Sequence, residues 1–358
     1  MQVAASLLDE AARLTAHPDW SPWVCATHFE LSPSVARNVS PTTLNKVRHA
    51  VRHRRPGSPS HILSDLRRSS ESALTVFGPL YSLPRCDRRL MGYADVTSIY
   101  ASPTGTPGVK DRIRAHLSRL ELRAQHAVIV ETSAMRARVE HVLAGHAPVM
   151  HVVPNAVNSR VLSAQRDESI ALRIGKARQD HDLLLAYPTR DYPHKNLEFL
   201  PAVAGELARI GVKAGFIVTL RPEEWDRRTP AFRAVCVNLG EVTIDQVATV
   251  LKTSDGLFFP SLLEAYSASP VEAMALGVPV FASDRDFVRT VCGDAAAYFD
   301  PHDGERAATV VFNGHNRPGD LRTRVEAGMR RVGKAPTARD RAMALLSTLY
   351  GSLPVEGT

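Results

Sequence analysis

The sequence predicts an α/β protein with two domains, each built on a parallel β-sheet. Short apolar runs, such as residues 256–259, are followed by polar loops and then by helical patterns, which is the alternation expected of parallel sheets. The chain has 358 residues, of which 44% are hydrophobic, and this length suits two domains of ordinary size. No apolar run approaches the length of a membrane span.

The first element is expected to be a helix over residues 1–14. Apolar residues recur there at helical spacing, including Leu7, Leu8, Ala11 and Leu14. No strand and no capping residue precede this pattern, although a domain of this kind normally opens with its central strand and a glycine-rich turn. We therefore state the hypothesis that the first domain lacks its first strand.

Two strands are predicted next, at residues 73–81 and 127–130. The second is followed by Thr132, which opens a helix. Tyr81, His126 and Thr132 lie at strand ends and are candidate ligand contacts, although a packing or turn role is the more common one for such residues.

A strand over residues 182–187 opens the second half of the chain. The loop after it carries Arg190 and Lys195, and a helix is expected at 197–210. Two cations five residues apart on one loop could both reach one diphosphate, where they would stabilise the charge of a leaving group. The alternative is a basic surface loop.

The most informative segment covers residues 256–282. A buried strand is predicted at 256–259, Glu264 and Glu272 lie eight residues apart, and a second strand follows at 278–282. Ser269 and the proline after it predict a helix start with Glu272 as the capping-box acid. The loop thus falls at the carboxyl edge of a sheet, where such proteins bind ligands. Otherwise Glu272 only caps its helix and Glu264 is a solvated acid.

These segments resemble the donor-site signature of the group 4 family of retaining glycosyltransferases. The sequence Pro-His-Lys-Asn at residues 193–196, the paired glutamates and the run VVPNAVN at 152–158 carry the resemblance. It implies the glycosyltransferase-B architecture, with two Rossmann-like domains facing a cleft. It also implies an acceptor-side domain at 1–158, a donor-binding domain at 159–336, and a last helix, within 337–358, that returns to the first domain.

The resemblance also assigns roles to residues of this chain. Glu272 would bind ribose hydroxyls, Glu264 the transferred sugar, and Arg190 with Lys195 the diphosphate. Further donor contacts follow from the matched loops. They are Asn155, Gly240 and Val242, together with Ala265, Tyr266 and Ser267, which stand where the family has Gly-Phe-Gly or a close variant. Gly240 and Val242 belong to a strand and loop at 235–242, before a helix at 244–252.

The implied activity is transfer of a sugar from a nucleoside-diphosphate sugar to a hydroxyl acceptor, in cell-surface polysaccharide or glycoconjugate synthesis. No cofactor and no metal are expected; Asp284 and Asp286 resemble a metal motif but suit a solvated turn. A non-catalytic nucleotide-sugar-binding relative, truncated and inactive, is the main alternative. A sugar-nucleotide epimerase stays open, whereas a dinucleotide oxidoreductase is disfavoured because no Gly-x-Gly-x-x-Gly occurs.

Charge is distributed unevenly along the chain. Residues 1–160 hold 20 Lys and Arg against 12 Asp and Glu, and the remainder holds 24 against 25. Basic clusters occur at 52–55, 67–68 and 85–89, which would attract an anionic membrane surface or a lipid-linked acceptor. A solvated basic surface is the alternative. No nucleic-acid-binding motif accompanies these clusters. The four scattered cysteines favour a reducing, cytoplasmic location, including the inner face of a membrane.

Overall fold

The computed structural model describes residues 2–27, 29–31, 35, 39–47, 51–53, 69–76, 85–100 and 108–351. Two compact units divide the chain. Unit 1 takes the described residues up to Asn158 and those from Pro336 on, and unit 2 takes Ser159–Ala335. Among the described helices, none combines the length and the apolar character that a bilayer crossing needs.

Unit 1 opens with helix α1 (Gln2–Leu14), as the spacing of apolar residues predicts. Its four-stranded parallel sheet has the order β3-β4-β5-β6. The strands are β3 (Ser69–Thr75), β4 (Arg85–Gly92), β5 (Ala127–Val130) and β6 (Val149–Val152). A separate parallel pair joins β1 (Phe29–Leu31) to β2 (Val51–His53). The strand at 127–130 is confirmed, whereas β4 was not predicted.

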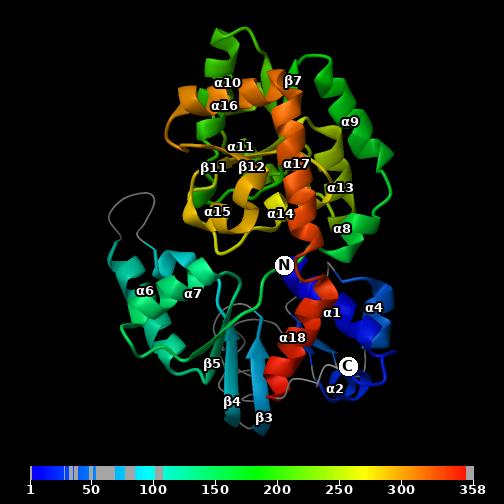
Figure 1. The fold of residues 1–358 in the computed structure, drawn as a ribbon, viewed down its shortest axis with the longest axis vertical. Coiled ribbons are helices and arrows are strands. Elements are labelled where there is room, and N and C mark those ends of the chain that lie inside the picture. Colours follow the sequence, from blue (N-terminus) through cyan, green and yellow to red (C-terminus); the bar gives the residue numbers. More distant parts are fainter. Residues whose placement is uncertain are drawn as a thin grey trace. The chain divides into compact units, whose positions relative to one another are not determined.

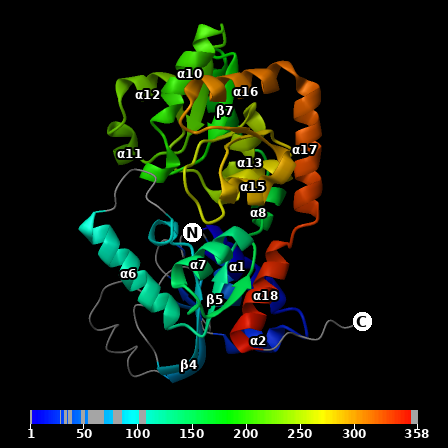
Figure 2. The same cartoon turned by 60° about the vertical axis from the view of Figure 1, so that its left-hand side comes forward.

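The helices of unit 1 complete it. They are α2 (Ser21–Ala26), α4 (Pro41–Lys46), the 3-10 turn η2 (Val96–Ser98), α6 (Val109–Arg123), α7 (Ser133–Leu143) and α18 (Ala338–Tyr350). Helix α18 lies against α1, and Leu345 and Leu346 pack with Leu7, Ala11 and Leu14 in one buried cluster (Figures 1 and 2). The last helix of the chain therefore closes the core that the first helix begins.

Unit 2 contains a six-stranded sheet of order β12-β11-β10-β7-β8-β9, in which all neighbours are parallel. The strands are β7 (Leu183–Tyr187), β8 (Ala214–Val218), β9 (Cys236–Asn238), β10 (Gly256–Phe259), β11 (Val280–Ser283) and β12 (Ala296–Phe299). Strands β7, β8, β10 and β11 are buried along their whole length, which explains their uniformly apolar sequences.

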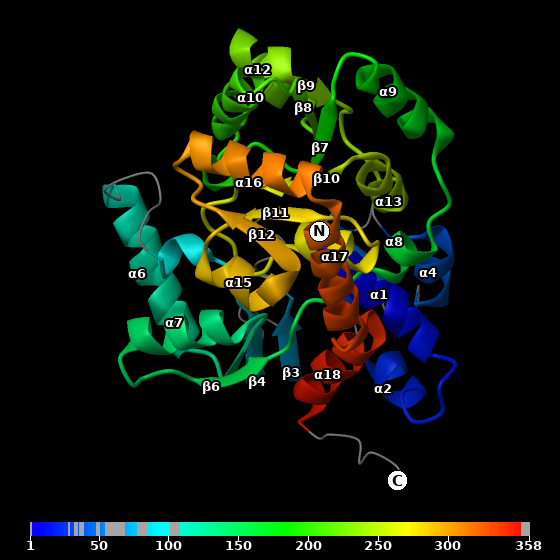
Figure 3. The ribbon, with the colours of Figure 1, turned by 45° about the horizontal axis from the view of Figure 1, so that its top comes forward.

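Helices cover both faces of this sheet. Figure 3 shows α10 (Phe199–Arg209), α12 (Pro230–Val235) and α16 (Gly304–Asn316) on one side of β7 and β10, with α9 (Glu168–Arg178) and α13 (Ile244–Thr253) on the other. The remaining elements are α8 (Ser159–Ser163), η3 (Pro193–Lys195), α11 (Pro222–Asp226), α14 (Ala268–Ala275), α15 (Asp286–Cys292), η4 (Gly293–Ala295) and α17 (Pro318–Gly333).

The strand order places a topological switch point between β7 and β10. The chain enters the sheet at β7, builds outward through β8 and β9, and then crosses to the other side of β7 to add β10, β11 and β12. The loops after β7 and β10 therefore run in opposite directions and leave a crevice at the carboxyl edge, the usual ligand site of such sheets.

Candidate functional site

The loops after β7 and β10 are joined by hydrogen bonds at this switch point. The carbonyl oxygen of His194 accepts from the Leu262 amide at 2.7 Å and from the Ser261 hydroxyl at 3.2 Å. The Asn196 side-chain amide donates to the Pro260 carbonyl at 3.4 Å and to the Pro301 carbonyl at 2.9 Å. Loops distant in sequence thus form one connected edge.

Lys195 and Glu264 meet at this edge in an ion pair between the Lys195 Nζ and the Glu264 Oε1 atoms. The Ser261 hydroxyl donates to the same carboxylate oxygen at 2.7 Å. The two side chains are only 16% and 14% exposed, so water screens their interaction weakly. The Lys195 carbonyl accepts from the Tyr187 hydroxyl at 2.9 Å, and burial raises the pKa of that hydroxyl well above its usual value.

Arg190 lies between two carboxylates. Its guanidinium donates to Glu224 at 2.9 and 3.2 Å and to Glu241 at 2.6 Å. Glu224 also accepts from the backbone amides of Arg221, at 2.9 Å, and Asp191, at 3.4 Å. Hydrogen bonds from Arg221 and Arg190 lower the pKa of Glu241, despite partial burial that opposes the shift. Arg190 is therefore held in place, but its charge is neutralised in the free protein.

Glu272 is buried in α14, with 3% of its surface exposed. Among the described residues its carboxylate has neither an ion pair nor a hydrogen bond. Burial alone raises the pKa of this carboxyl to about 7. A buried carboxyl without a partner costs the fold free energy, which is typical of groups that serve a ligand.

The capping box predicted for this helix is wrong. Helix α14 begins at Ala268, with Ser267 as its N-cap and without a side-chain cap hydrogen bond. Ser269 and Pro270 therefore lie inside the first turn. Proline is tolerated there because the amide groups of the first turn have no intrahelical acceptor, so Pro270 did not mark the first helical residue.

The residues at the family's glycine positions form the entry to α14. Ala265 is 9% exposed, and Ser267 has φ 72°, a left-handed value that glycine adopts far more easily. Gly240 has φ 74°, and its amide donates to the Asn238 side chain at 3.1 Å. Tyr266 and Val242 are half-buried. Asn155 belongs to unit 1 and is 7% exposed.

Comparison with known proteins finds one family model that matches a segment of this chain. Residues 233–311, which include Gly240, Glu264 and Glu272, match the family model described as Glycosyl transferases group 1. The match covers less than a quarter of the chain and lies wholly in unit 2. The group 4 assignment stays a prediction. A comparison with curated proteins finds no match.

Solved structures of similar fold come from several organisms. HepE from Anabaena, solved in complex with UDP and glucose, is 13% identical with a TM-score of 0.67, covering 97% of this chain and 96% of that one. A glycosyltransferase from Rickettsia africae ESF-5 is 12% identical with a TM-score of 0.66, covering 99% and 95%. Sucrose-phosphate synthase from Thermosynechococcus elongatus is 17% identical with a TM-score of 0.60, covering 74% and 67%. The fold is therefore the glycosyltransferase-B fold, as predicted.

Three residues of the candidate site were not found from the sequence. They are Ser261, Glu224 and Glu241, which hold Glu264 and Arg190. Only Glu224 had a local signal, because it stands three residues after Arg221 and two after a proline, a helix-start pattern. The pairings themselves join residues on different loops and leave no trace in the sequence.

Other residues singled out in the sequence have structural roles. The Asp284 carboxylate pairs with Arg289, and the described residues contain no cluster of acidic, histidine or cysteine side chains suited to a metal. His126 accepts from the Arg89 amide at 3.1 Å, and Thr132 caps α7 by accepting from the Met135 amide at 3.0 Å. Tyr81 and the basic residues at 54–55 and 67–68 lie outside the described residues, as do the side chains of Arg52 and Arg85.

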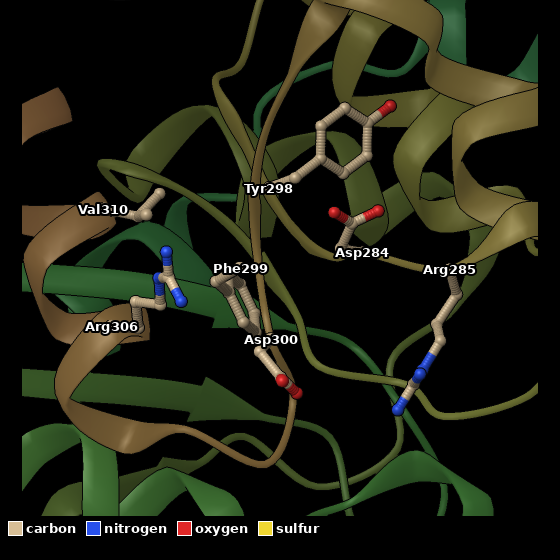
Figure 4. Close-up of a pocket in the computed structure, with 7 residues that line it drawn as sticks. All are labelled: Asp284, Arg285, Tyr298, Phe299, Asp300, Arg306 and Val310. Atoms are coloured by element: carbon tan, nitrogen blue, oxygen red, sulfur yellow. The ribbon is translucent and has the colours of Figure 1, made fainter.

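Apart from the switch point, a hollow of 440 Å³ lies at the carboxyl ends of β11 and β12 (Figure 4). Two arginines and two aspartates line it, and three of these four side chains bond to residues outside the lining: Asp284 pairs with Arg289, and His302 contacts the other two. Arg285 contacts the His302 ring at 2.9 Å, and Asp300 accepts from the His302 amide at 3.0 Å. It is lined by Asp284, Arg285, Tyr298, Phe299, Asp300, Arg306 and Val310.

Proposed function

We propose that this protein transfers a sugar from a nucleoside-diphosphate sugar to a hydroxyl acceptor, with retention of configuration at the anomeric carbon. The observation that carries the proposal is the ion pair of Lys195 with Glu264 at the switch point. It joins the loop after β7, which also carries Arg190, to the loop that leads to Glu272, a buried carboxyl with no partner among the described residues. The family match of residues 233–311 supports the same activity. We propose a cytoplasmic role in cell-surface polysaccharide or glycoconjugate synthesis.

In the proposed reaction, the bond between the anomeric carbon and the diphosphate oxygen breaks, and its electron pair goes to that oxygen. The acceptor hydroxyl oxygen then bonds to the anomeric carbon on the same face, and its proton passes to the departing diphosphate. Lys195 and Arg190 would stabilise the charge that grows on the diphosphate. Glu272 would accept ribose hydroxyls, Glu264 would orient the sugar, and metal-chelating agents should leave the rate unchanged.

UDP is the first nucleotide to test, since HepE was solved with UDP and glucose. Titration calorimetry should show UDP binding to the wild-type protein. Lys195→Ala should weaken it by roughly tenfold or more, because a charge-assisted contact to phosphate is lost. Lys252→Ala, on α13, is the control for removal of one positive charge. Unchanged UDP affinity in Lys195→Ala would remove the site assignment.

A non-catalytic binding protein is the second candidate, and two observations favour it. Arg190 is neutralised by Glu224 and Glu241, and Ser267 keeps a left-handed conformation without glycine. Incubation with a panel of nucleoside-diphosphate sugars distinguishes the two. Release of nucleoside diphosphate, lost in Lys195→Ala, identifies an enzyme. Binding of the sugar nucleotide without any turnover identifies the non-catalytic protein.

A further inference from the structure

Helix α6 of unit 1 carries an apolar face that no part of the described protein covers. Four aliphatic side chains on it are 73%, 55%, 58% and 48% exposed, far more than a packed helix allows. We call them the α6 stripe: Val109, Ile113, Leu117 and Leu120. At about 100° per residue they fall within an arc of about 80°, so they form one continuous strip along the helix.

The α6 stripe points away from the core of unit 1. The opposite side of the helix, about 180° around, is the one that packs. Leu122 on that side is fully buried, and the Ser118 hydroxyl lies 3.0 Å from the Tyr93 hydroxyl. Figure 2 shows α6 at the margin of unit 1. The stripe is therefore separate from the contacts that hold the helix in place.

Basic residues flank the α6 stripe on both sides. By helical position, Lys110 borders one edge and Arg112 the other, and neither side chain forms an ion pair or a hydrogen bond within the described residues. The helix contains five basic residues against two acidic ones, Asp111 and Glu121. Long basic side chains beside an apolar strip can place their charged ends among lipid phosphates while their stems cover apolar surface.

We propose that the α6 stripe docks on an anionic lipid bilayer, with the four aliphatic side chains entering the headgroup boundary. Apolar residues on one face, basic residues on its borders and few acids are the chemistry of a helix that lies in a membrane interface. The positive excess of residues 1–160 favours the same partner. This inference deepens the proposed function, because it would bring the transferase to a lipid-linked acceptor.

Vesicle co-sedimentation of the full chain tests the proposal. Wild-type protein should bind vesicles of phosphatidylcholine with roughly a third phosphatidylglycerol, and bind phosphatidylcholine alone much less. Ile113→Ser with Leu117→Ser should lower binding by about tenfold or more. Lys110→Glu with Arg112→Glu should lower it by at least about tenfold, since each basic residue near the surface contributes roughly fivefold.

Leu162→Ser with Leu172→Ser is the matched control, because these leucines are 54% and 62% exposed in unit 2. This control should bind vesicles like the wild type. If Ile113→Ser with Leu117→Ser bound vesicles as well as the wild type does, the proposal would be overturned. Sedimentation velocity without lipid tests a second copy of the chain as the partner. If the wild type and the control self-associated and Ile113→Ser with Leu117→Ser did not, the stripe would be a dimer contact and the membrane proposal would be overturned.

UDP titration separates this inference from the proposed function. Both α6 variants should bind UDP as the wild type does, since the stripe lies in unit 1 and the donor residues in unit 2. Failure to bind vesicles with UDP binding intact would refute the docking surface alone. Vesicle binding without any UDP binding would refute the transferase assignment alone.

Discussion

At the scale of single residues, the candidate site is defined by carboxylates whose partners differ. Glu264 pairs with Lys195 and accepts a hydrogen bond from Ser261, and Glu224 pairs with Arg190. Glu272 has no partner within the described residues. A paired carboxylate stabilises the loop it belongs to, whereas an unpaired buried one destabilises the free protein. The same residue type therefore serves two purposes here, and each can be tested separately.

Glu272→Gln should stabilise the free protein at pH 8 by up to about 3 kcal/mol. The carboxyl of Glu272 has a pKa of about 7 in the fold and 4.5 as its ordinary value. Between these values the folded state binds more protons than the unfolded chain, so the free energy of unfolding falls as pH rises. Glutamine avoids this loss, and its advantage should disappear near pH 4.5.

Urea unfolding of both proteins between pH 4.5 and 8 measures this difference. Glu223→Gln, at an exposed carboxylate, controls for the removal of one negative charge. If the difference in the free energy of unfolding between Glu272→Gln and wild type stayed constant across that range, the pKa of the Glu272 carboxyl would not be raised in the fold.

Glu224→Gln and Glu241→Gln should change UDP affinity in opposite directions. Glu224 is buried enough to position Arg190, so its neutralisation should weaken UDP binding by roughly tenfold. Glu241 is 56% exposed and competes with a diphosphate for the same guanidinium, so its neutralisation should tighten binding by up to about fivefold. Titration calorimetry measures both, and a change of the same sign in both variants would refute the distinction.

At the scale of elements, the turn into α14 stores strain. Ser267 takes φ 72° so that the loop after β10 can enter the helix, although a side chain is unfavourable in this conformation. The strain persists because the neighbouring segments, β10 and Pro270–Met274, are buried and fix both ends of the turn. Glycine would adopt the same backbone freely.

Ser267→Gly should therefore raise the free energy of unfolding by about 1 kcal/mol, as relief of strain exceeds the added freedom of the unfolded chain. Ala268→Gly is the neighbouring control. It lies within α14 and should lower stability by about 1 kcal/mol. Thermal melting followed by circular dichroism measures both, and a loss of stability in Ser267→Gly would show that its hydroxyl matters more than its backbone.

The elements that the sequence predicted well are those with uniform burial. Strands β5, β7 and β10 are entirely buried, so their apolar runs were unambiguous. Strand β4 was missed because four of its first five residues are charged, namely Arg85, Asp87, Arg88 and Arg89, and within residues 87–92 only the last three are buried. The start of α14 was misplaced by two residues, because Pro270 was taken as the first helical residue and the helix begins at Ala268. The order of the strands could not be derived from the sequence. That order makes β7 and β10 neighbours and so brings Lys195, after β7, to Glu264, after β10.

At the scale of the whole molecule, unit 1 is discontinuous in sequence. Its core combines α1 and α18, which are separated by the whole of unit 2. The Tyr350 hydroxyl donates to the Trp23 carbonyl at 2.9 Å and lies 2.8 Å from the Thr27 hydroxyl. The carboxyl-terminal helix is thus an integral part of the first unit.

Leu345→Ala should destabilise unit 1 by roughly 2–5 kcal/mol, because Leu345 is 3% exposed and its removal leaves a cavity. Hydrogen exchange measured by mass spectrometry should show faster exchange in α1 and α18 and little change in β7 and β10. Leu207→Ala, at a fully buried position of α10, should give the reverse pattern. Equal acceleration in both units would show that they unfold together.

The discontinuity of unit 1 also affects folding during translation. The apolar face of α1 emerges from the ribosome early, but its partner α18 is translated only after unit 2. Unit 2 is built from one continuous stretch, Ser159–Ala335, and can fold before α18 is made, while Leu7, Ala11 and Leu14 of α1 remain uncovered. Nascent chains halted before residue 338 should accordingly be the ones that chaperones retain.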